Sequence, residues 1–263
     1  MLEKIKSLGV LTYDEKMSLR VVELPGVKFE NPIFIEGTPD VGLVGTIAAV
    51  HLIVSKRLEE VARFESDLFP PLIVIRNKQI KDPVSVFGNG KLFVINSDIP
   101  IPGSAVYSFA KEACSWLSAK KPEVVILIGG LPDPNRVDTE DPIVLGLPTD
   151  RKAENLMEEI GIEPLENGFL VGVKALLLKE CKSSGLSALG LFAQSYYNYP
   201  DPGAAAKVLQ HLSKLDLLKV DVESLLKKAE EVRINYRELM RRTESEMGRI
   251  GKSKEYEPPI PLV

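Results

Sequence analysis

The sequence predicts an α/β protein: a three-layer α/β/α sandwich on a mostly parallel sheet, followed by a C-terminal helical extension. Short runs of branched apolar residues, bounded by turn formers, alternate along the chain with longer segments of helical periodicity. Strands that are apolar throughout are typical of parallel sheets covered by helices on both faces. At 263 residues with 44% hydrophobic content, the chain can build such a core without disulfides or metals.

The expected strands and helices follow one another over most of the chain. Residues 19–24 are a candidate edge strand, and the run 32–36 is closed by a turn at 37–40 that leads into a buried helix at 41–55. Further strands are expected at 61–66, 72–76, 91–96, 124–129 and 187–192. Helices are expected at 104–120, 151–160, 171–181 and 202–215.

The C-terminal region has a different pattern. Apolar residues step by three and four through a segment rich in Lys, Arg and Glu: Val222, Leu225, Ala229, Val232, Tyr236 and Leu239. This heptad seam is shorter than a secure coiled coil, so two interpretations stay open: it binds a partner, or it packs on its own domain. We expect an α/β core at 1–220, a C-terminal helix at 221–248 and a flexible Pro-rich tail at 249–263.

Charge and apolar content exclude two classes of partner. Lys and Arg number 33 against 37 Asp and Glu, so the net charge is −4 and no basic field attracts nucleic acid. No apolar run approaches the ~18 residues that cross a bilayer, and the first residues are charged where a signal peptide is apolar. We therefore predict a cytoplasmic protein that binds neither nucleic acid nor membrane, with Cys114 and Cys181 reduced and buried.

The turn after the run 32–36 is where a phosphate-binding loop would lie. Its glycines are Gly37, Gly42 and Gly45. The dinucleotide fingerprint would need a glycine at Asp40, and a P-loop would need Lys and Ser or Thr after its second glycine. Asp40 would repel phosphate but suits a helix N-cap. The glycines favour a tight turn with close packing of helix on sheet, and phosphate binding stays the alternative.

Residues that commonly carry catalysis or bind metals are sparse. His51 and His211 lie in expected helices, without ligand spacing to cysteine or to each other, and no G-x-S-x-G elbow occurs. A group of acidic residues follows the strand 124–129: Asp133, Asp138, Glu140 and Asp141. Asn96, Ser97 and Asp98, at the end of another strand, could lie beside this group. Such a group could bind a cation, although acidic residues of this kind more often form a solvated surface loop. We predict no catalytic residue, no metal site and no cofactor.

Four segments occur in an order that points to a known family: 35–45 (IEGTPDVGLVG), 69–71 (FPP), 128–130 (IGG) and 199–206 (YPDPGAAA), with further likeness at 220–222 and 225–231. Together they resemble the proteasome assembly chaperone 2 family. The residues that carry the resemblance are Gly37, Pro39, Gly42, Gly45, Pro70, Gly129, Gly130 and Pro202. The ATP-grasp label sometimes attached to this family finds neither a phosphate loop nor a paired metal-binding Glu/Asn signature here.

The resemblance implies a core related to the purine nucleoside phosphorylase architecture, assembled into homo-oligomers or paralogous pairs. It also implies binding to 20S proteasome subunits or particles, in part through a C-terminal tail ending hydrophobic-Tyr-any. The partner-binding residues would be Ile260, Pro261, Leu262 and Val263, so that Leu262 stands where the family has tyrosine. A leucine can enter an apolar pocket, but the hydrogen bond of the phenol is lost, and a ring of tails would be needed to recover affinity.

The function predicted is therefore a scaffold that acts as a proteasome assembly chaperone or an ATP-independent proteasome activator. The alternative is a nucleotide- or nucleoside-binding enzyme whose pocket is formed by the turn at 37–45 and the loop at 133–141. A third possibility is an oligomeric adaptor for an unrelated protein, which would use the same C-terminal helix and tail.

Overall fold

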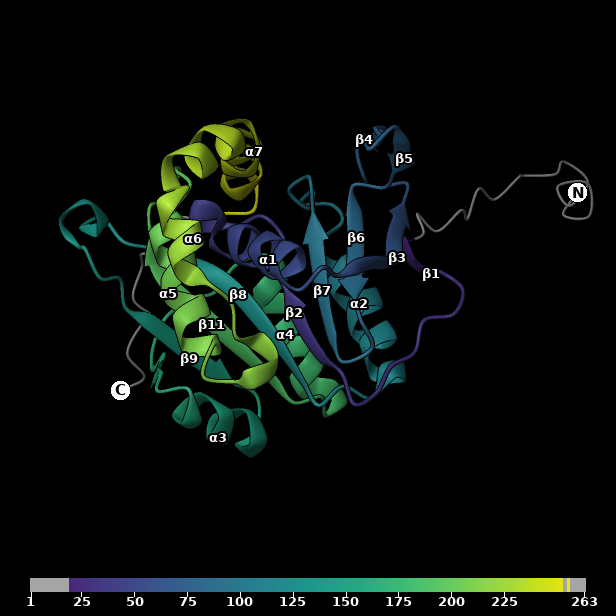
Figure 1. The fold of residues 1–263 in the computed structure, drawn as a ribbon, viewed down its shortest axis with the longest axis horizontal. Coiled ribbons are helices and arrows are strands. Elements are labelled where there is room, and N and C mark those ends of the chain that lie inside the picture. The colour runs from purple at the N-terminus through teal and green to yellow at the C-terminus, as the bar shows by residue number, and fades with distance from the viewer. Residues whose placement is uncertain (1–18, 253–254, 256–263) are drawn as a thin grey trace, which may run out of the picture.

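Helices cover both faces of one large sheet (Figure 1). The computed structural model describes residues 19–252 and residue 255. The strands are β1 (Leu19–Glu23), β2 (Ile33–Glu36), β3 (Glu59–Ser66), β4 (Val74–Arg76), β5 (Gln79–Lys81), β6 (Val84–Gly88), β7 (Leu92–Ser97), β8 (Val124–Pro132), β9 (Val144–Pro148), β10 (Glu163–Pro164) and β11 (Ala188–Ser195). The helices are η1 (Val41–Leu43), α1 (Val44–Ser55), α2 (Val106–Lys120), η2 (Arg136–Asp138), α3 (Arg151–Glu159), α4 (Val173–Ser184), α5 (Pro202–Leu212), η3 (Asp216–Leu218), α6 (Val222–Lys227) and α7 (Ala229–Arg249).

The large sheet has nine strands in the order β1-β3-β6-β7-β2-β8-β11-β9-β10. The four central strands, β7, β2, β8 and β11, run parallel, whereas the pairs β1–β3, β3–β6, β6–β7 and β11–β9 are antiparallel. The α/β/α class is confirmed, and the sheet is mixed because β6 and β7 are joined by a tight turn and not by a helical crossover. The predicted edge strand at 19–24 is β1, at one end of the sheet.

The central strands are buried on both faces. In β2, Ile33 and Ile35 belong to one apolar core, while Phe34 between them belongs to the other. Helices α1, α3, α5, α6 and α7 contribute to the first core, and α2 and α4 contribute to the second. Because helices cover both faces of the sheet, the central strands are apolar on both faces and do not alternate between apolar and polar residues.

The C-terminal seam packs on its own domain. Leu225, Met240 and Met247 are buried in the first core, and Val232 and Tyr236 pack against it. The helix is also divided, since α6 ends at Lys227 and α7 begins at Ala229. Of the two interpretations of the heptad seam, packing on the same chain is the one that the structure shows.

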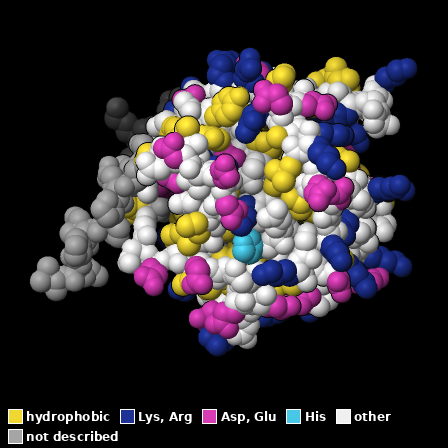
Figure 2. All heavy atoms as spheres, turned by 60° about the vertical axis from the view of Figure 1, so that its left-hand side comes forward, with side chains coloured by type: hydrophobic (Ala, Val, Ile, Leu, Met, Phe, Trp, Pro, Cys, Tyr) yellow, Lys and Arg dark blue, Asp and Glu magenta, His cyan; other side chains and the backbone are white. Residues whose placement is uncertain are grey.

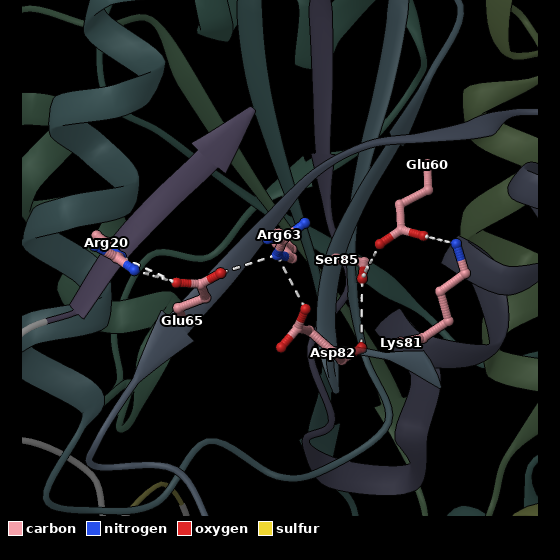
Figure 3. A network of polar contacts seen from close by, with 7 residues as sticks. All are labelled: Arg20, Glu60, Arg63, Glu65, Lys81, Asp82 and Ser85. Carbon is pink, nitrogen blue, oxygen red and sulfur yellow. Dashed lines mark hydrogen bonds and ion pairs between the residues drawn. The ribbon is translucent and has the colours of Figure 1, made fainter. Parts of the chain in front are cut away.

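The strand predicted at 72–76 is not part of the main sheet. Its residues 74–76 form β4, which pairs only with β5 in a separate two-stranded sheet. Figure 3 shows the polar contacts that fix the base of this hairpin: Lys81 Nζ lies 2.6 Å from Glu60 Oε2 on β3, and Arg63 Nε lies 3.0 Å from Asp82 Oδ2. The hairpin β4–β5 is therefore attached to strand β3, in the antiparallel half of the sheet, by ion pairs at its base.

Two further predictions concern cysteines and membrane spans. Cys114 and Cys181 are both buried and unpaired, which confirms their predicted state. Within residues 19–252, no helix combines the length and the apolar content needed to span a membrane.

Candidate functional site

The family-like turn after β2 lies at the carboxyl end of the parallel strands, the edge where open α/β sheets usually bind ligands. The chain leaves β2 at Glu36, forms the short helix η1 and then enters α1. Gly42 and Leu43 both have positive φ, at 59° and 51°. Glycine accepts this backbone conformation without strain, and a Cβ on Gly42 would lie 1.8 Å from Ser195 Oγ. Two features therefore require glycine at position 42.

The other glycines of the turn allow α1 to touch the sheet. A Cβ on Gly45 would lie 2.1 Å from the carbonyl oxygen of Ile128, and one on Gly130 would lie 2.4 Å from that of Val41. A Cβ on Gly37 would meet the carbonyl oxygen of Gly45 at 2.5 Å in the same way. This is the predicted structural role of the glycines, because the space beside the start of α1 is taken by carbonyl groups and not by an anion site.

Asp40 does not cap the following helix, contrary to the prediction. Its side chain makes no capping hydrogen bond to η1 and is turned into a buried ionic cluster. The reason is that two lysines reach the same place. Lys174 Nζ lies 3.5 Å from Glu36 Oε2 and 3.8 Å from Asp40 Oδ2, and it donates to the carbonyl of Thr38 at 3.0 Å.

Gly129 makes room for that lysine. A Cβ on Gly129 would lie 2.8 Å from the Cδ of Lys174, whose side chain is only 2% exposed. The lysine starts from α4 on one side of the sheet and passes β8 at this glycine to reach the turn after β2. The motif at 128–130 and the motif at 35–45 thus form one polar centre.

The second lysine comes from the start of the C-terminal tail. Lys252 Nζ lies 3.0 Å from Asp40 Oδ1 and 2.8 Å from Glu255 Oε1, and it donates to the carbonyl of Val171 at 2.7 Å. The amide of Val171 donates to Glu255 Oε1 at 2.8 Å. The side chains of Lys252 and Glu255 are 2% and 0% exposed. We call Lys252 and Glu255, with their contacts to Asp40 and Val171, the tail anchor.

Burial and charge act in opposite directions on the pKa values of the tail anchor. Burial raises the pKa of Glu255 to about 7, although the ammonium of Lys252 opposes the shift. For Lys252, burial alone would lower the pKa, but the carboxylates of Asp40 and Glu255 outweigh it and raise the pKa above its ordinary value. The ammonium is therefore kept charged inside the protein.

A second buried ion pair holds the late motif at 199–206. Arg136 Nε donates to Asp201 Oδ2 at 2.8 Å, and Asp201 Oδ1 accepts from the amide of Ala204 as the N-cap of α5. The amide of Asp201 donates to the carbonyl of Gly42 at 2.8 Å. Pro202 occupies the first turn of α5, where a missing N–H does no harm. The late motif therefore packs directly on the first one.

Comparison with known proteins identifies the group to which this arrangement belongs. The PAC2 family profile matches residues 34–240, which include the turn after β2, Lys174 and the pair Arg136–Asp201 but not Lys252 or Glu255. The chain belongs to the PAC2 family.

Three archaeal proteins are among the chain's relatives. The chain is 31% identical over 242 residues to the uncharacterized protein MJ0106 of Methanocaldococcus jannaschii, over 91% of this chain and 97% of that one. Among solved structures, Pyrococcus furiosus PbaA, described as an archaeal homolog of proteasome-assembly chaperone, matches with a TM-score of 0.80 at 31% identity, over 87% of this chain and 99% of that one. Pyrococcus furiosus PbaB, described as an archaeal proteasome activator, matches with a TM-score of 0.70 at 25% identity, over 85% and 99%.

The acidic loop of this PAC2-family chain does not form a cluster. Asp141 pairs with Lys207 at 2.6 Å, and Asp133 accepts from the amide of Asn135. Asp98 at the end of β7 pairs instead with Arg76 of the hairpin, and β2 lies between β7 and β8. Among the described residues, no group of three metal-binding side chains comes together.

The family-motif residues do not all meet. Gly37, Pro39, Gly42, Gly45, Gly129, Gly130 and Pro202 lie around the carboxyl edge of the sheet, whereas Pro70 lies in the segment after β3 and lines a different pocket. The predicted partner-binding residues Ile260, Pro261, Leu262 and Val263 lie outside the described residues. Sequence reasoning missed Lys174, Lys252 and Glu255, because a charged residue in a polar segment carries no pattern that marks it as buried.

Proposed function

We propose that this PAC2-family protein binds 20S proteasome subunits or particles as an assembly chaperone or ATP-independent activator, in part through residues 260–263. The observation that carries the proposal is the tail anchor. It ties the root of the tail to Asp40 in the turn after β2, a motif of the family, by the 3.0 Å contact of Lys252, and Glu255 holds the same ammonium at 2.8 Å. The structural likeness to PbaA and PbaB supports the same function.

The anchor gives the tail a defined point of departure from the body. A tail that starts at a fixed place samples a smaller volume than one that begins at a loose chain end. If several copies assemble, fixed starting points also hold the tails at reproducible separations, and linked tails gain affinity by roughly 10² to 10⁴ when they dock together. We propose that the protein self-associates for this reason.

The space lined by Pro39 and Asp40 of the family-like turn has little room for a small-molecule substrate. The space between Pro39, Asp40, Lys174 and Ile250 has a volume of about 20 Å³. A cavity needs roughly 10–15 Å³ to hold one water molecule, whereas ligand pockets usually reach roughly 300 Å³ or more. The family-like turn therefore supports a structural and protein-binding use better than a nucleotide-binding one.

The surface carries apolar side chains suited to contacts with other proteins. Figure 2 shows one face, on which lysine, arginine and acidic side chains are interspersed with apolar areas. On the hairpin β4–β5, Ile75 and Ile80 are cross-strand partners that are 72% and 74% exposed, and Ile73 beside them is 57% exposed. Exposed apolar groups of this kind mark protein–protein contact sites.

The test of the proposal is binding to purified 20S particles by co-sedimentation. The variant Ile260→Asp/Leu262→Asp places charge on the apolar tip of the tail and should weaken binding at least about tenfold. The matched control is Ile143→Asp, which puts a charge on an exposed apolar residue of the body and should bind normally. Full binding by the tail variant would rule out the tail mechanism, and native mass spectrometry of the same samples reports the oligomeric state.

A further inference from the structure

A pocket of about 360 Å³ lies beside α7, away from the tail anchor. Three segments line it: the stretch after β3, the loop after β7 and the last turns of α7. The lining residues are Pro70, Leu72, Ile99, Pro100, Pro102, Arg241, Arg242, Ser245 and Glu246. This volume lies at the lower end of the range for ligand pockets, which is roughly 300–1,000 Å³. We call it the proline pocket.

The floor of the proline pocket is apolar and rigid. Pro70, Pro100 and Pro102 cannot rotate about φ, and Ile99 is only 3% exposed. Leu72 is 37% exposed at the open side. A floor of this composition suits a segment of prolines and aliphatic residues, because extended proline segments dock in apolar grooves with little loss of entropy.

The rim of the proline pocket is basic. Arg241 and Arg242 are 73% and 52% exposed, and both contact Glu238 on the same helix. Within the described contacts, Arg242 engages Glu238 through its Nε alone. The acidic residue of the rim, Glu246, is paired with Arg249 and accepts from the amide of Gly103 at 3.2 Å. An additional carboxylate would therefore be attracted to the arginine side of the rim.

The C-terminal segment of the chain has an acidic residue followed by prolines and aliphatic residues, which matches the basic rim and the apolar floor of the proline pocket. Residues 255–263 read EYEPPIPLV, so that Glu257 comes immediately before Pro258, Pro259 and an apolar tip. Acid followed by prolines and aliphatic residues is complementary to a basic rim followed by a proline and aliphatic floor.

The distance also permits docking of this segment. The small space that contains Ile250 at the end of α7 shares Pro100 and Glu246 with the proline pocket, so the two adjoin. Residues 256–263 follow the tail anchor, and an extended chain of that length spans up to about 27 Å. The tail can reach the pocket from its own anchor.

We propose that the proline pocket receives residues 257–262 of the same chain, with Glu257 at the arginine rim and the prolines and Leu262 on the apolar floor. A docked tail is withheld from other proteins, and a partner that binds the tail must first displace it. The proposal does not depend on which partner the tail binds.

The test is intrachain crosslinking in the full-length protein. Ser245→Cys places a thiol on the pocket one turn from the arginine rim, and Tyr256→Cys places one immediately before Glu257. Mild oxidation should produce a disulfide between positions 245 and 256 within one chain, identified by peptide mass mapping. The buried Cys114 and Cys181 are retained, and the map distinguishes their peptides.

Charge reversal separates docking from simple proximity. Arg241→Glu/Arg242→Glu should slow crosslinking roughly fivefold, the effect expected of two exposed ion pairs, and adding Glu257→Lys should restore the rate. Glu257→Lys alone should also slow it, which tests the same contact without changing the pocket. A rate that ignores all these charges, or a disulfide formed only between two chains, would overturn docking within one chain. No proteasome is present, so the result is independent of the proposed function.

Discussion

Lys252 and Asp40 are separated by 212 positions in the sequence, yet their charged groups lie 3.0 Å apart inside the protein. Asp40 belongs to the turn after β2, and Lys252 stands at the start of the tail. Glu255 and the carbonyl of Val171 complete the coordination of the ammonium. The contact links the most family-like motif of the chain to the segment that we propose binds the partner.

Removing the ammonium should destabilise this region strongly. Lys252→Met would remove the nearest counter-charge of Asp40 and the ammonium paired with Glu255, leaving only Lys174, 3.8 Å from Asp40. Breaking a buried ion pair in this way typically lowers the free energy of unfolding by about 3 kcal/mol. Urea denaturation at pH 8 measures the change. The control Asp40→Asn/Lys252→Met/Glu255→Gln has no charge to compensate and should recover most of the loss. Equal losses in the single and the triple variant would show that lysine packing, not charge, is what matters.

The tail anchor should also respond to pH through Glu255. Its pKa is about 7 in the protein against an ordinary value of 4.5, so the folded state binds the proton more tightly than the unfolded state. The contribution of this proton is complete below pH 4.5 and is lost as the pH rises to 7. The stability of the native protein relative to Glu255→Gln should therefore fall between pH 5 and 7, by up to about 1.4 kcal/mol per unit. Urea unfolding of both proteins across this range gives the difference, and a flat difference contradicts the assignment.

The packing of α1 on the sheet should make Gly45 intolerant of a methyl group. Gly45→Ala would place Cβ 2.1 Å from the carbonyl oxygen of Ile128, and backbone atoms at both sides must move. We expect the free energy of unfolding to fall by about 1–3 kcal/mol, as for other overpacked cores. Gly248→Ala is the control, since nothing lies within 4 Å of its Cβ position and alanine favours a helix. Thermal unfolding followed by circular dichroism should separate the two variants clearly.

The buried pair Arg136–Asp201 should be as sensitive as the tail anchor. Arg136→Met would leave the Asp201 carboxylate, only 1% exposed, with the Ala204 amide as a remaining partner. The expected loss is about 3–5 kcal/mol of unfolding free energy. Arg151→Met removes an arginine whose side chain is 71% exposed and should change stability little. Comparable losses in the two variants would contradict a special role for the buried pair.

Much of the fold could be predicted from apolar pattern alone. The runs at 32–36 and 124–129 are strands because both of their faces meet apolar helices, and periodicity reports burial directly. The antiparallel half was harder to predict. The strand β6 was not among the expected strands, although its Asn89-Gly90 turn into β7 is a hairpin signal, and β9 is short with a glycine at its centre.

The candidate site was less predictable than the fold. The glycines at 37, 42 and 45 could be assigned to a tight turn with close packing, because their spacing matches neither a dinucleotide-binding fingerprint nor a P-loop. Lys174 and Lys252 could not be found, since their burial depends on Gly129 and on a contact across 212 positions. The sequence pattern does not distinguish a lysine whose ammonium is solvated from one whose ammonium is buried against carboxylates.

The remaining test separates the scaffold from the nucleotide enzyme. A nucleotide pocket formed by the turn at 37–45 and the loop at 133–141 would need space and positive charge at the start of α1. The space that this turn lines at Pro39 and Asp40 has a volume of only about 20 Å³, and its lining includes no residue of the loop at 133–141. We therefore expect isothermal titration calorimetry of the full-length protein with ATP, ADP and nucleosides to detect no binding with a Kd of about 1 mM or tighter. A Kd of about 1 mM corresponds to a binding free energy of about −4 kcal/mol. A saturable heat with one of these ligands, lost in Gly45→Leu but kept in Gly248→Ala, would place a nucleotide site at this turn and favour the enzyme.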